Sequence, residues 1–300
     1  YNFNTDLANQ YITAVADAGE KLSGISTLYD MVIPTSIDID LPESYIDRNQ
    51  LNTSDQRQAI EEYIYPSIQA MNSSVKTVSI FDTLKSHANE YLYFRTDHHW
   101  KPEAAFFAWQ ALTDELEGRY GLAADPALTD PANWDTRVLE HFFLGSQGKR
   151  VGSLYAGADD ITLYTPKFDT ELTYSCPAYG FTRTGPFETS VCFPERVAQQ
   201  DWFNGNPYTY YAGGDYPIAT ITNHKNPDGP RVVLLRDSFA CALTPFLALS
   251  CSELTTIDLR YFEGDLLDTI AGLEPDIALT LYAASTTRLD NLFQYEHTEE

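Results

Sequence analysis

The last quarter of the chain alternates strand and helix patterns, and this alternation limits the fold more than any other feature. Val232–Leu235, Leu254–Leu259 and Ile277–Leu281 are short apolar runs typical of buried strands. The segments between them, 239–249 and 263–273, have the length and apolar spacing of helices. Strand–helix–strand units of this kind close by right-handed crossovers and build a parallel sheet. We therefore expect an α/β protein with helices on both faces of its sheet.

The first 120 residues continue this alternation, whereas the middle of the chain does not. Patterns predict helices at 5–22, 53–71 and 102–120, and strands at 27–33, 75–81 and 91–94. From about 122 to 229, Pro, Gly, Asn and Asp interrupt short β-type runs, which favours hairpins with long loops. The interpretation is one domain over 1–300, a three-layer α/β/α sandwich with a parallel sheet and a β-rich insertion at about 122–229.

The charge balance limits the partners. The chain has 19 Lys and Arg against 43 Asp and Glu, a formal net charge of −24. Such a surface repels phosphate backbones and anionic lipid, so nucleic-acid binding is not expected. No apolar run approaches the roughly 20 residues that span a bilayer, and no transmembrane segment is predicted.

Smaller counts indicate a compartment. The first residue is Tyr1, which is expected if a leader has been removed. The 20 Tyr and 4 Trp fit either sugar binding on flat aromatic faces or ordinary core packing. Cys176 and Cys192 flank a turn-rich segment, which suits a disulfide in an exported protein. No C-x-x-C pair exists, so a zinc ribbon is excluded by spacing.

Two loops that lead into predicted helices carry reactive side chains. One is Thr96–Trp100, before the helix at 102, and the other is Arg236–Phe239, after a strand. Ligands of open parallel sheets bind at such loops, beyond the carboxyl ends of the strands. A serine needs a base, and the base needs a group that holds its tautomer. The sharpest hypothesis is a triad with Ser238 as nucleophile, His99 as base and Asp97 as its orienting carboxylate.

Simpler readings of the same residues exist. An Asp-Ser pair before a helix is usually only an N-cap. Asp97 with His98 and His99 offers ligands that suit zinc or iron, but none of the other four histidines is spaced as a third ligand, and no metal is predicted. His98 is interpreted as a neighbour of the base, a structural hydrogen bonder or a substrate contact.

The string Tyr93–Trp100, with Asp-His-His-Trp at its end, resembles the signature of the DHHW family of bacterial exported proteins. That family is similar to the SGNH-hydrolase-like domains of alginate O-acetyltransferases. Met31–Thr35, Gly148–Gly152, Asp237–Phe239 and Asp258–Phe262 extend the resemblance along the chain. It implies an SGNH-like fold and the same triad, and adds Arg260 and Tyr282 as oxyanion or substrate-binding residues.

The resemblance also carries departures and functional expectations. SGNH enzymes begin with Gly-Asp-Ser, whereas Arg236 precedes Asp237 here and is expected to narrow the approach to Ser238. The implied activity is Ser-His-Asp acyl-ester chemistry on extracellular carbohydrate, most directly polysaccharide O-acetyltransfer, with an acetyl donor and no cofactor. A carbohydrate acetylesterase and a non-catalytic carbohydrate-binding or cell-surface protein are the alternatives. Each places the protein outside the cell or at the cell envelope.

Overall fold

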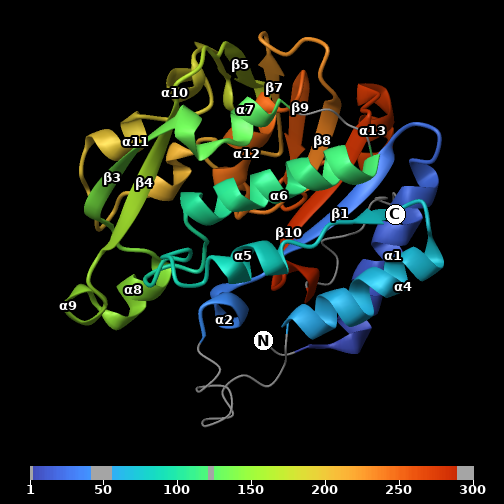
Figure 1. Ribbon diagram of the computed structural model, residues 1–300, viewed down its shortest axis with the longest axis horizontal. Coiled ribbons are helices and arrows are strands. Elements are labelled where there is room, and N and C mark those ends of the chain that lie inside the picture. The colour runs from blue at the N-terminus through green and yellow to red at the C-terminus, as the bar shows by residue number, and fades with distance from the viewer. Residues whose placement is uncertain (1–2, 42–55, 121–124, 289–300) are drawn as a thin grey trace.

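The computed structural model describes residues 3–41, 56–120 and 125–288, and Figure 1 shows their arrangement. An eight-stranded sheet runs through the molecule in the order β2-β1-β10-β8-β9-β7-β5-β6. The five strands from β2 to β9 are parallel, while β7, β5 and β6 continue the sheet as antiparallel neighbours. The strands are β1 Thr27–Ile33, β2 Lys76–Thr77, β5 Leu172–Cys176, β6 Phe181–Gly185, β7 Ile218–Asn223, β8 Arg231–Arg236, β9 Glu253–Ile257 and β10 Ile277–Ala283.

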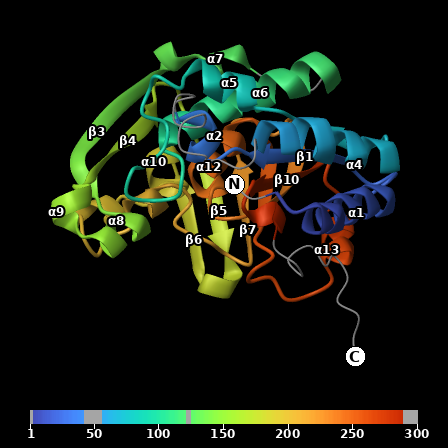
Figure 2. The ribbon, with the colours of Figure 1, turned by 90° about the horizontal axis from the view of Figure 1, so that it is seen from below.

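Helices cover both faces of this sheet. Right-handed crossovers from β8 to β9 and from β9 back to β10 run in opposite directions across the sheet, so their helices lie on opposite faces. In Figure 2, α6 lies above the parallel strands, and α1 and α13 lie below them. The main helices are α1 Thr5–Lys21, α4 Tyr65–Met71, α5 Phe81–Ser86, α6 Pro102–Tyr120, α12 Ala240–Leu249 and α13 Leu266–Leu273. All ten residues of α12 are buried, because it lies between the sheet and α6.

The predicted alternation is therefore confirmed at both ends of the chain. The helix expected at 53–71 is observed as a π-helical stretch, Gln58–Ile64, followed by α4, and the capping residues 53–55 lie outside the described residues. The segment expected to be β-rich does contain strands. One pair, β3 Trp134–Phe143 and β4 Asp159–Pro166, stands apart from the main sheet as a long ribbon, whereas β5, β6 and β7 extend that sheet. This segment also contains the short helices α7 Pro126–Thr129, α8 Ser146–Val151, α9 Ser153–Ala156, α10 Phe187–Ser190 and α11 Glu195–Ala198. A further short helix, α2 Ser36–Ile39, follows β1.

Two predicted strands are wrong in extent. Only Lys76 and Thr77 of 75–81 pair with β1, and helix α5 begins at Phe81. The apolar residues of this run are buried, so its apolar pattern indicates burial rather than strand pairing. Segment 91–94 forms a single bridge, from Tyr93 to Trp100, and does not enter the sheet.

The predicted disulfide is also wrong, since Cys176 and Cys192 are both buried free thiols. Cys176 ends β5 and its Sγ donates to the Ile218 carbonyl at 3.4 Å, whereas Cys192 pairs through its backbone with Tyr211. Burial raises the pKa of both thiols. The argument for export from this disulfide therefore falls away. Among the described residues, no helix is both long and apolar enough to cross a membrane.

Candidate functional site

Three side chains from the two predicted loops form one hydrogen-bonded chain. His99 Nδ1 lies 2.5 Å from Asp97 Oδ1, and His99 Nε2 lies 2.8 Å from Ser238 Oγ. Ser238 occupies the turn between β8 and α12. His99 belongs to the loop closed by the Tyr93–Trp100 bridge. Residues 139 positions apart thus meet at the carboxyl edge of the sheet, where the topology places ligands.

Asp97 is held as a charged acceptor. Its Oδ2 accepts hydrogen bonds from the Ser146 backbone N–H at 2.9 Å and from the Ser146 hydroxyl at 3.1 Å. Burial opposes ionisation of Asp97, but its hydrogen bond with His99, the charge of that imidazole and the Ser146 N–H outweigh it, so the pKa lies well below the usual range. Ser146 begins α8 and was not among the residues predicted from the sequence, because nothing local links it to position 97.

The residue before Ser146 has to be small. A Cβ atom on Gly145 would lie 2.3 Å from the Asp97 Cβ, closer than any side chain could tolerate. A Cβ on Gly148 would lie 2.6 Å from the Thr96 Cβ. The two glycines therefore let the backbone of α8 approach the Asp97 loop closely enough for Ser146 to reach the carboxylate.

Aromatic rings enclose His99 on its remaining sides. The Tyr208 ring stacks on it at a centroid distance of 4.3 Å, and the Phe239 ring lies at 4.9 Å. Its side chain is 12% exposed, whereas that of His98 is 51% exposed and only 3.5 Å from Asp97 through Nδ1. Burial and the neighbouring His99 lower the pKa of His98. The imidazole between Asp97 and Ser238 is thus the enclosed one, and His98 is its solvent-facing neighbour.

Several hydrogen bonds hold the turn that carries Ser238. Asp237 accepts hydrogen bonds from the Phe239 N–H through Oδ1, and from the Ala283 N–H and the Thr286 hydroxyl through Oδ2. The Phe239 carbonyl accepts from Trp100 Nε1 and from the Tyr208 hydroxyl, both at 2.8 Å. Asp237 therefore caps the turn and ties it to the end of β10.

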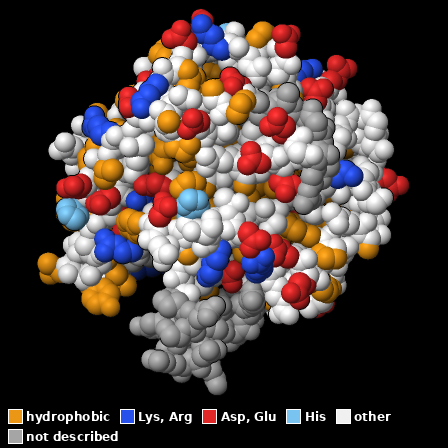
Figure 3. Space-filling view, in the orientation of Figure 1, with side chains coloured by type: hydrophobic (Ala, Val, Ile, Leu, Met, Phe, Trp, Pro, Cys, Tyr) orange, Lys and Arg blue, Asp and Glu red, His pale blue; other side chains and the backbone are white. Residues whose placement is uncertain are grey.

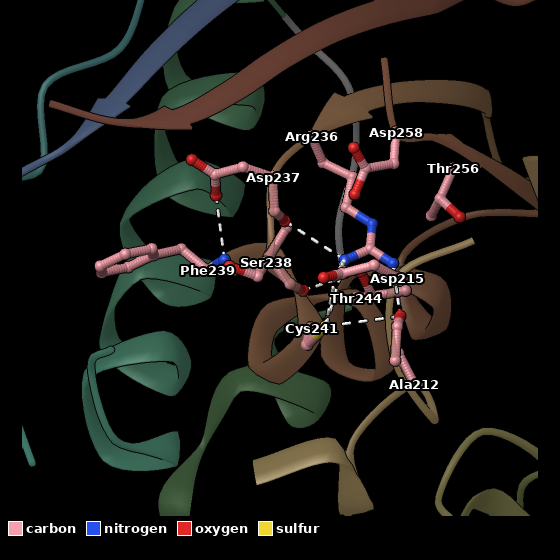
Figure 4. Close-up of polar contacts among 12 residues, drawn as sticks. Ala212, Asp215, Arg236, Asp237, Ser238, Phe239, Cys241, Thr244, Thr256 and Asp258 are labelled. Carbon is pink, nitrogen blue, oxygen red and sulfur yellow. Dashed lines mark hydrogen bonds and ion pairs between the residues drawn. The ribbon is translucent and has the colours of Figure 1, made fainter. Parts of the chain in front are cut away.

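Arg236 does not narrow the approach to Ser238, because its side chain is completely buried. Its guanidinium donates to Asp215 Oδ1 at 2.7 Å, to the Gly214 carbonyl at 2.6 Å and to the Asp237 carbonyl at 3.2 Å (Figure 4). It also lies 3.1 Å from the Cys241 Sγ, and burial raises the pKa of that thiol to about 12, so the thiol stays neutral. The expected obstruction is wrong, since the arginine supports the backbone of the turn instead.

The two additional residues lie in different settings. Arg260 is held by Asp258 through Nε and Nη2, and its Nη2 lies 3.0 Å from Asp215 Oδ2. Its charge reaches the site, because it contributes to lowering the pKa of His98. Tyr282 is buried in β10, opposite Val32 of β1. The structure therefore holds Arg260, which follows β9, on Asp258 and Asp215, and places Tyr282 within the sheet.

Asp97, His98 and His99 also form the one cluster of metal-ligand type found in the described part of the chain, with ligand atoms within 4.8 Å of one another. Asp97 Oδ1 and His99 Nδ1, however, face each other at 2.5 Å, which leaves no room for an ion between them. His99 Nε2 faces Ser238. Asp97 Oδ1 and both ring nitrogens of His99 are thus hydrogen-bonded to one another or to Ser238 in this structure.

The fold and this edge site define an SGNH-hydrolase-like α/β/α protein with an Asp-His-Ser hydrogen-bonded chain. The family model described as DHHW protein matches residues 1–255, so the chain belongs to the DHHW family. Among curated proteins, none matches the chain in sequence.

Solved structures share the fold. A DHHW family protein from Eubacterium siraeum DSM 15702 superimposes with a TM-score of 0.77 at 23% identity, covering 99% of this chain and 91% of that one. Bacillus cereus PatB1, solved with a sulfonyl adduct, gives 0.77 at 22% identity, covering 99% and 94%. The O-acetyltransferase domain of Pseudomonas putida AlgJ gives 0.51 at 14% identity, covering 96% and 87%.

Proposed function

We propose that this chain performs acyl-ester chemistry on carbohydrate at or outside the cell envelope, most directly the transfer of an acetyl group to a polysaccharide hydroxyl. The observation that carries the proposal is the continuous hydrogen-bonded chain from Asp97 through His99 to Ser238. A serine in such a chain is an activated nucleophile. The whole chain 1–300 is proposed to act as one SGNH-like domain, with 122–229 as its insertion.

The proposed reaction has two balanced halves. Ser238 Oγ attacks the acetyl carbonyl of the donor while His99 Nε2 takes the hydroxyl proton, and the same proton then leaves with the departing alkoxide. The resulting acetyl-serine is attacked by an acceptor hydroxyl, whose proton passes to His99 and then to Ser238 Oγ. Asp97 holds the tautomer and stabilises the imidazolium in each half. None of these steps requires a cofactor.

Negative charge develops on the carbonyl oxygen in both halves of the reaction, and hydrogen-bond donors are needed to stabilise it. Among the described residues, the Ser238 N–H has no hydrogen-bond acceptor, and it lies at the start of α12, where the helix dipole favours negative charge. The Phe239 N–H is already bound to Asp237. Ser238 N–H is thus the first oxyanion donor in this proposal, and Arg260 and Tyr282 remain the predicted additional residues.

The similar structures support the choice of reaction class. PatB1 was solved with a sulfonyl adduct, and the AlgJ domain is an O-acetyltransferase domain. Transfer and hydrolysis share the acetyl-serine and differ only in whether a sugar hydroxyl or water attacks it. A carbohydrate acetylesterase is therefore the alternative outcome of the same chemistry.

The test offers the protein an activated acetyl ester together with neutral oligosaccharides, and follows acetylated products by mass spectrometry. Wild type is expected to release the leaving group and to acetylate an acceptor, and Ser238→Ala to do neither. Ser252→Ala, a serine at the amino end of β9, is the matched control and should behave as wild type. Equal turnover by Ser238→Ala and wild type would contradict the proposal and favour the non-catalytic carbohydrate-binding reading.

A further inference from the structure

Helices α8 and α9 form a convex tip that exposes large apolar side chains. Leu154 is 105% exposed and Tyr155 88%, the two highest values among the exposed large hydrophobic residues of the described chain, and Val151 is 60% exposed. Figure 1 shows α9 at the outer end of the molecule, and in Figure 3 hydrophobic side chains project from the same corner. Contiguous apolar surface of this kind on a water-soluble fold marks an interaction site.

A second pair of exposed apolar residues adjoins the tip. Trp202 and Phe203 are both exposed, and the Trp202 carbonyl accepts a hydrogen bond from the Leu144 N–H just before α8. Lys149 Nζ lies 5.8 Å from the centroid of the Phe203 ring. Five of the exposed large hydrophobic residues in the described chain thus fall in two short segments joined by these contacts.

The charge of the tip is opposite to that of the protein. Lys149 and Arg150 lie in the last turn of α8, whereas the whole chain carries −24. Asp201 precedes Trp202, and hydrogen bonds from Asn204, with a smaller effect of the Lys149 charge, lower its pKa. Arg95 is paired with the buried Asp159. Acidic groups more than about 10 Å away are screened at physiological salt, so a planar anionic surface would meet the local cations first.

We propose that the tip formed by Lys149–Tyr155 together with Trp202 and Phe203 is a docking surface for a lipid bilayer that contains anionic lipid. Aliphatic and aromatic side chains that enter the headgroup region beside lysine and arginine are the combination that binds such interfaces. A sugar chain fits less well, because its binding sites are concave and hydrogen-bonded, whereas Leu154 and Val151 are aliphatic and project outward.

The tip is joined rigidly to the candidate site. The first residue of α8, Ser146, binds Asp97, and the Gly148 N–H donates to the Thr96 carbonyl at 2.8 Å. Docking would therefore hold the Ser238 site close to the membrane surface. The docking proposal rests on exposure and charge alone, so it can fail while the proposed reaction stands, and the reverse.

Vesicle flotation of the full chain tests it. Wild type is expected to float with vesicles of phosphatidylcholine mixed with phosphatidylglycerol, and at least about fivefold less with phosphatidylcholine alone. Leu154→Asp/Tyr155→Asp should lose the binding, and Lys149→Gln/Arg150→Gln should lose the preference for phosphatidylglycerol. The control Ile25→Asp/Met71→Asp makes the same charge change at two exposed apolar residues elsewhere and should bind as wild type.

Circular dichroism and thermal unfolding confirm that each variant is folded. Failure of wild type to float, equal flotation on both vesicle types, or equal flotation of the Leu154/Tyr155 variant and wild type would each overturn the proposal. The proposal would also be overturned if the Leu154/Tyr155 variant kept its vesicle binding but lost retention on oligosaccharide or lost self-association.

Discussion

The Trp100 indole donates a hydrogen bond to the Phe239 carbonyl at 2.8 Å, and so joins the loop that carries His99 to the turn that carries Ser238. Each member of this pair is sequence-adjacent to a member of the hydrogen-bonded chain. The Tyr208 hydroxyl binds the same carbonyl, and its ring stacks on His99. The last residue of the Asp-His-His-Trp string therefore holds the His99 loop against the Ser238 turn.

Removing that hydrogen bond should lower activity. Trp100→Phe keeps a buried ring and leaves the Phe239 carbonyl bound to Tyr208, but the smaller ring also leaves a cavity, so we expect a loss of about 1–3 kcal/mol in unfolding free energy. A small displacement of His99 from Ser238 should lower kcat about 10- to 100-fold. Trp109→Phe is the matched control, because Trp109 is equally buried but donates to Ser250. Similar kcat values for the two variants would show that Trp100 has no aligning role.

The two adjacent histidines should behave differently. His99→Gln removes the group between Asp97 and Ser238 and should lower kcat about 10²- to 10⁴-fold. His98→Gln should stay within about tenfold of wild type, because His98 faces solvent and touches Asp97 only at 3.5 Å. Ester hydrolysis measured for both variants checks this order. The reverse order would assign the base to His98.

Two arginines of β8 offer a matched pair for stability. Arg236→Met leaves Asp215 and two backbone carbonyls without their buried partner, and should destabilise the fold by about 3–5 kcal/mol. Arg231 lies at the other end of β8 and forms an exposed ion pair with Glu253. Arg231→Met breaks this pair and should lower the unfolding free energy by about 1 kcal/mol or less. Urea unfolding of both variants measures the difference. Equal midpoints would mean that the Arg236 contacts do not stabilise the nucleophile turn.

Asp30 should make stability depend on pH. Burial raises its pKa to about 6, although hydrogen bonds from Thr280 and Tyr11 partly oppose the shift. Because the folded-state pKa is the higher one, the contribution is fully present below about pH 4 and is lost as the pH rises to about 6. Asp30→Asn should therefore gain stability relative to wild type over this window, by about 3 kcal/mol at most. Thermal unfolding at pH 4 and pH 7.5 compares the two proteins, and a difference that does not change with pH would contradict the assigned shift.

Periodicity was a good guide where elements are buried in layers. The strands β1, β8, β9 and β10 and the helices α1, α6 and α12 lie where apolar spacing predicts them. Ser238 follows β8 at the carboxyl edge of the sheet, as the topology predicts. The loop with Asp97 and His99 follows no strand of that sheet, and the hydrogen bond from Trp100 to Phe239 joins it to the Ser238 turn.

Other features depend on contacts that local patterns do not contain. The apolar residues of segment 75–81 are buried without forming a full strand. Only two residues of the segment pair with β1, at the edge of the sheet. The bond from Ser146 to Asp97 spans 49 residues and depends on the close approach at Gly145. The position of Arg236 beside Ser238 predicts a side chain near the site, but the ion pair with Asp215, 21 residues earlier, directs that side chain into the core.

The most direct test of the account is whether an acetyl group is transiently held on Ser238. Wild type mixed with an activated acetyl ester, quenched in acid and digested, should show a peptide containing Ser238 that is heavier by about 42 Da, the mass of one acetyl group. His99→Gln should form it far more slowly, and Ser238→Ala should not form it. Acetylation that appears at other residues, or at equal rates in wild type and His99→Gln, would contradict Ser238 as the nucleophile activated by His99.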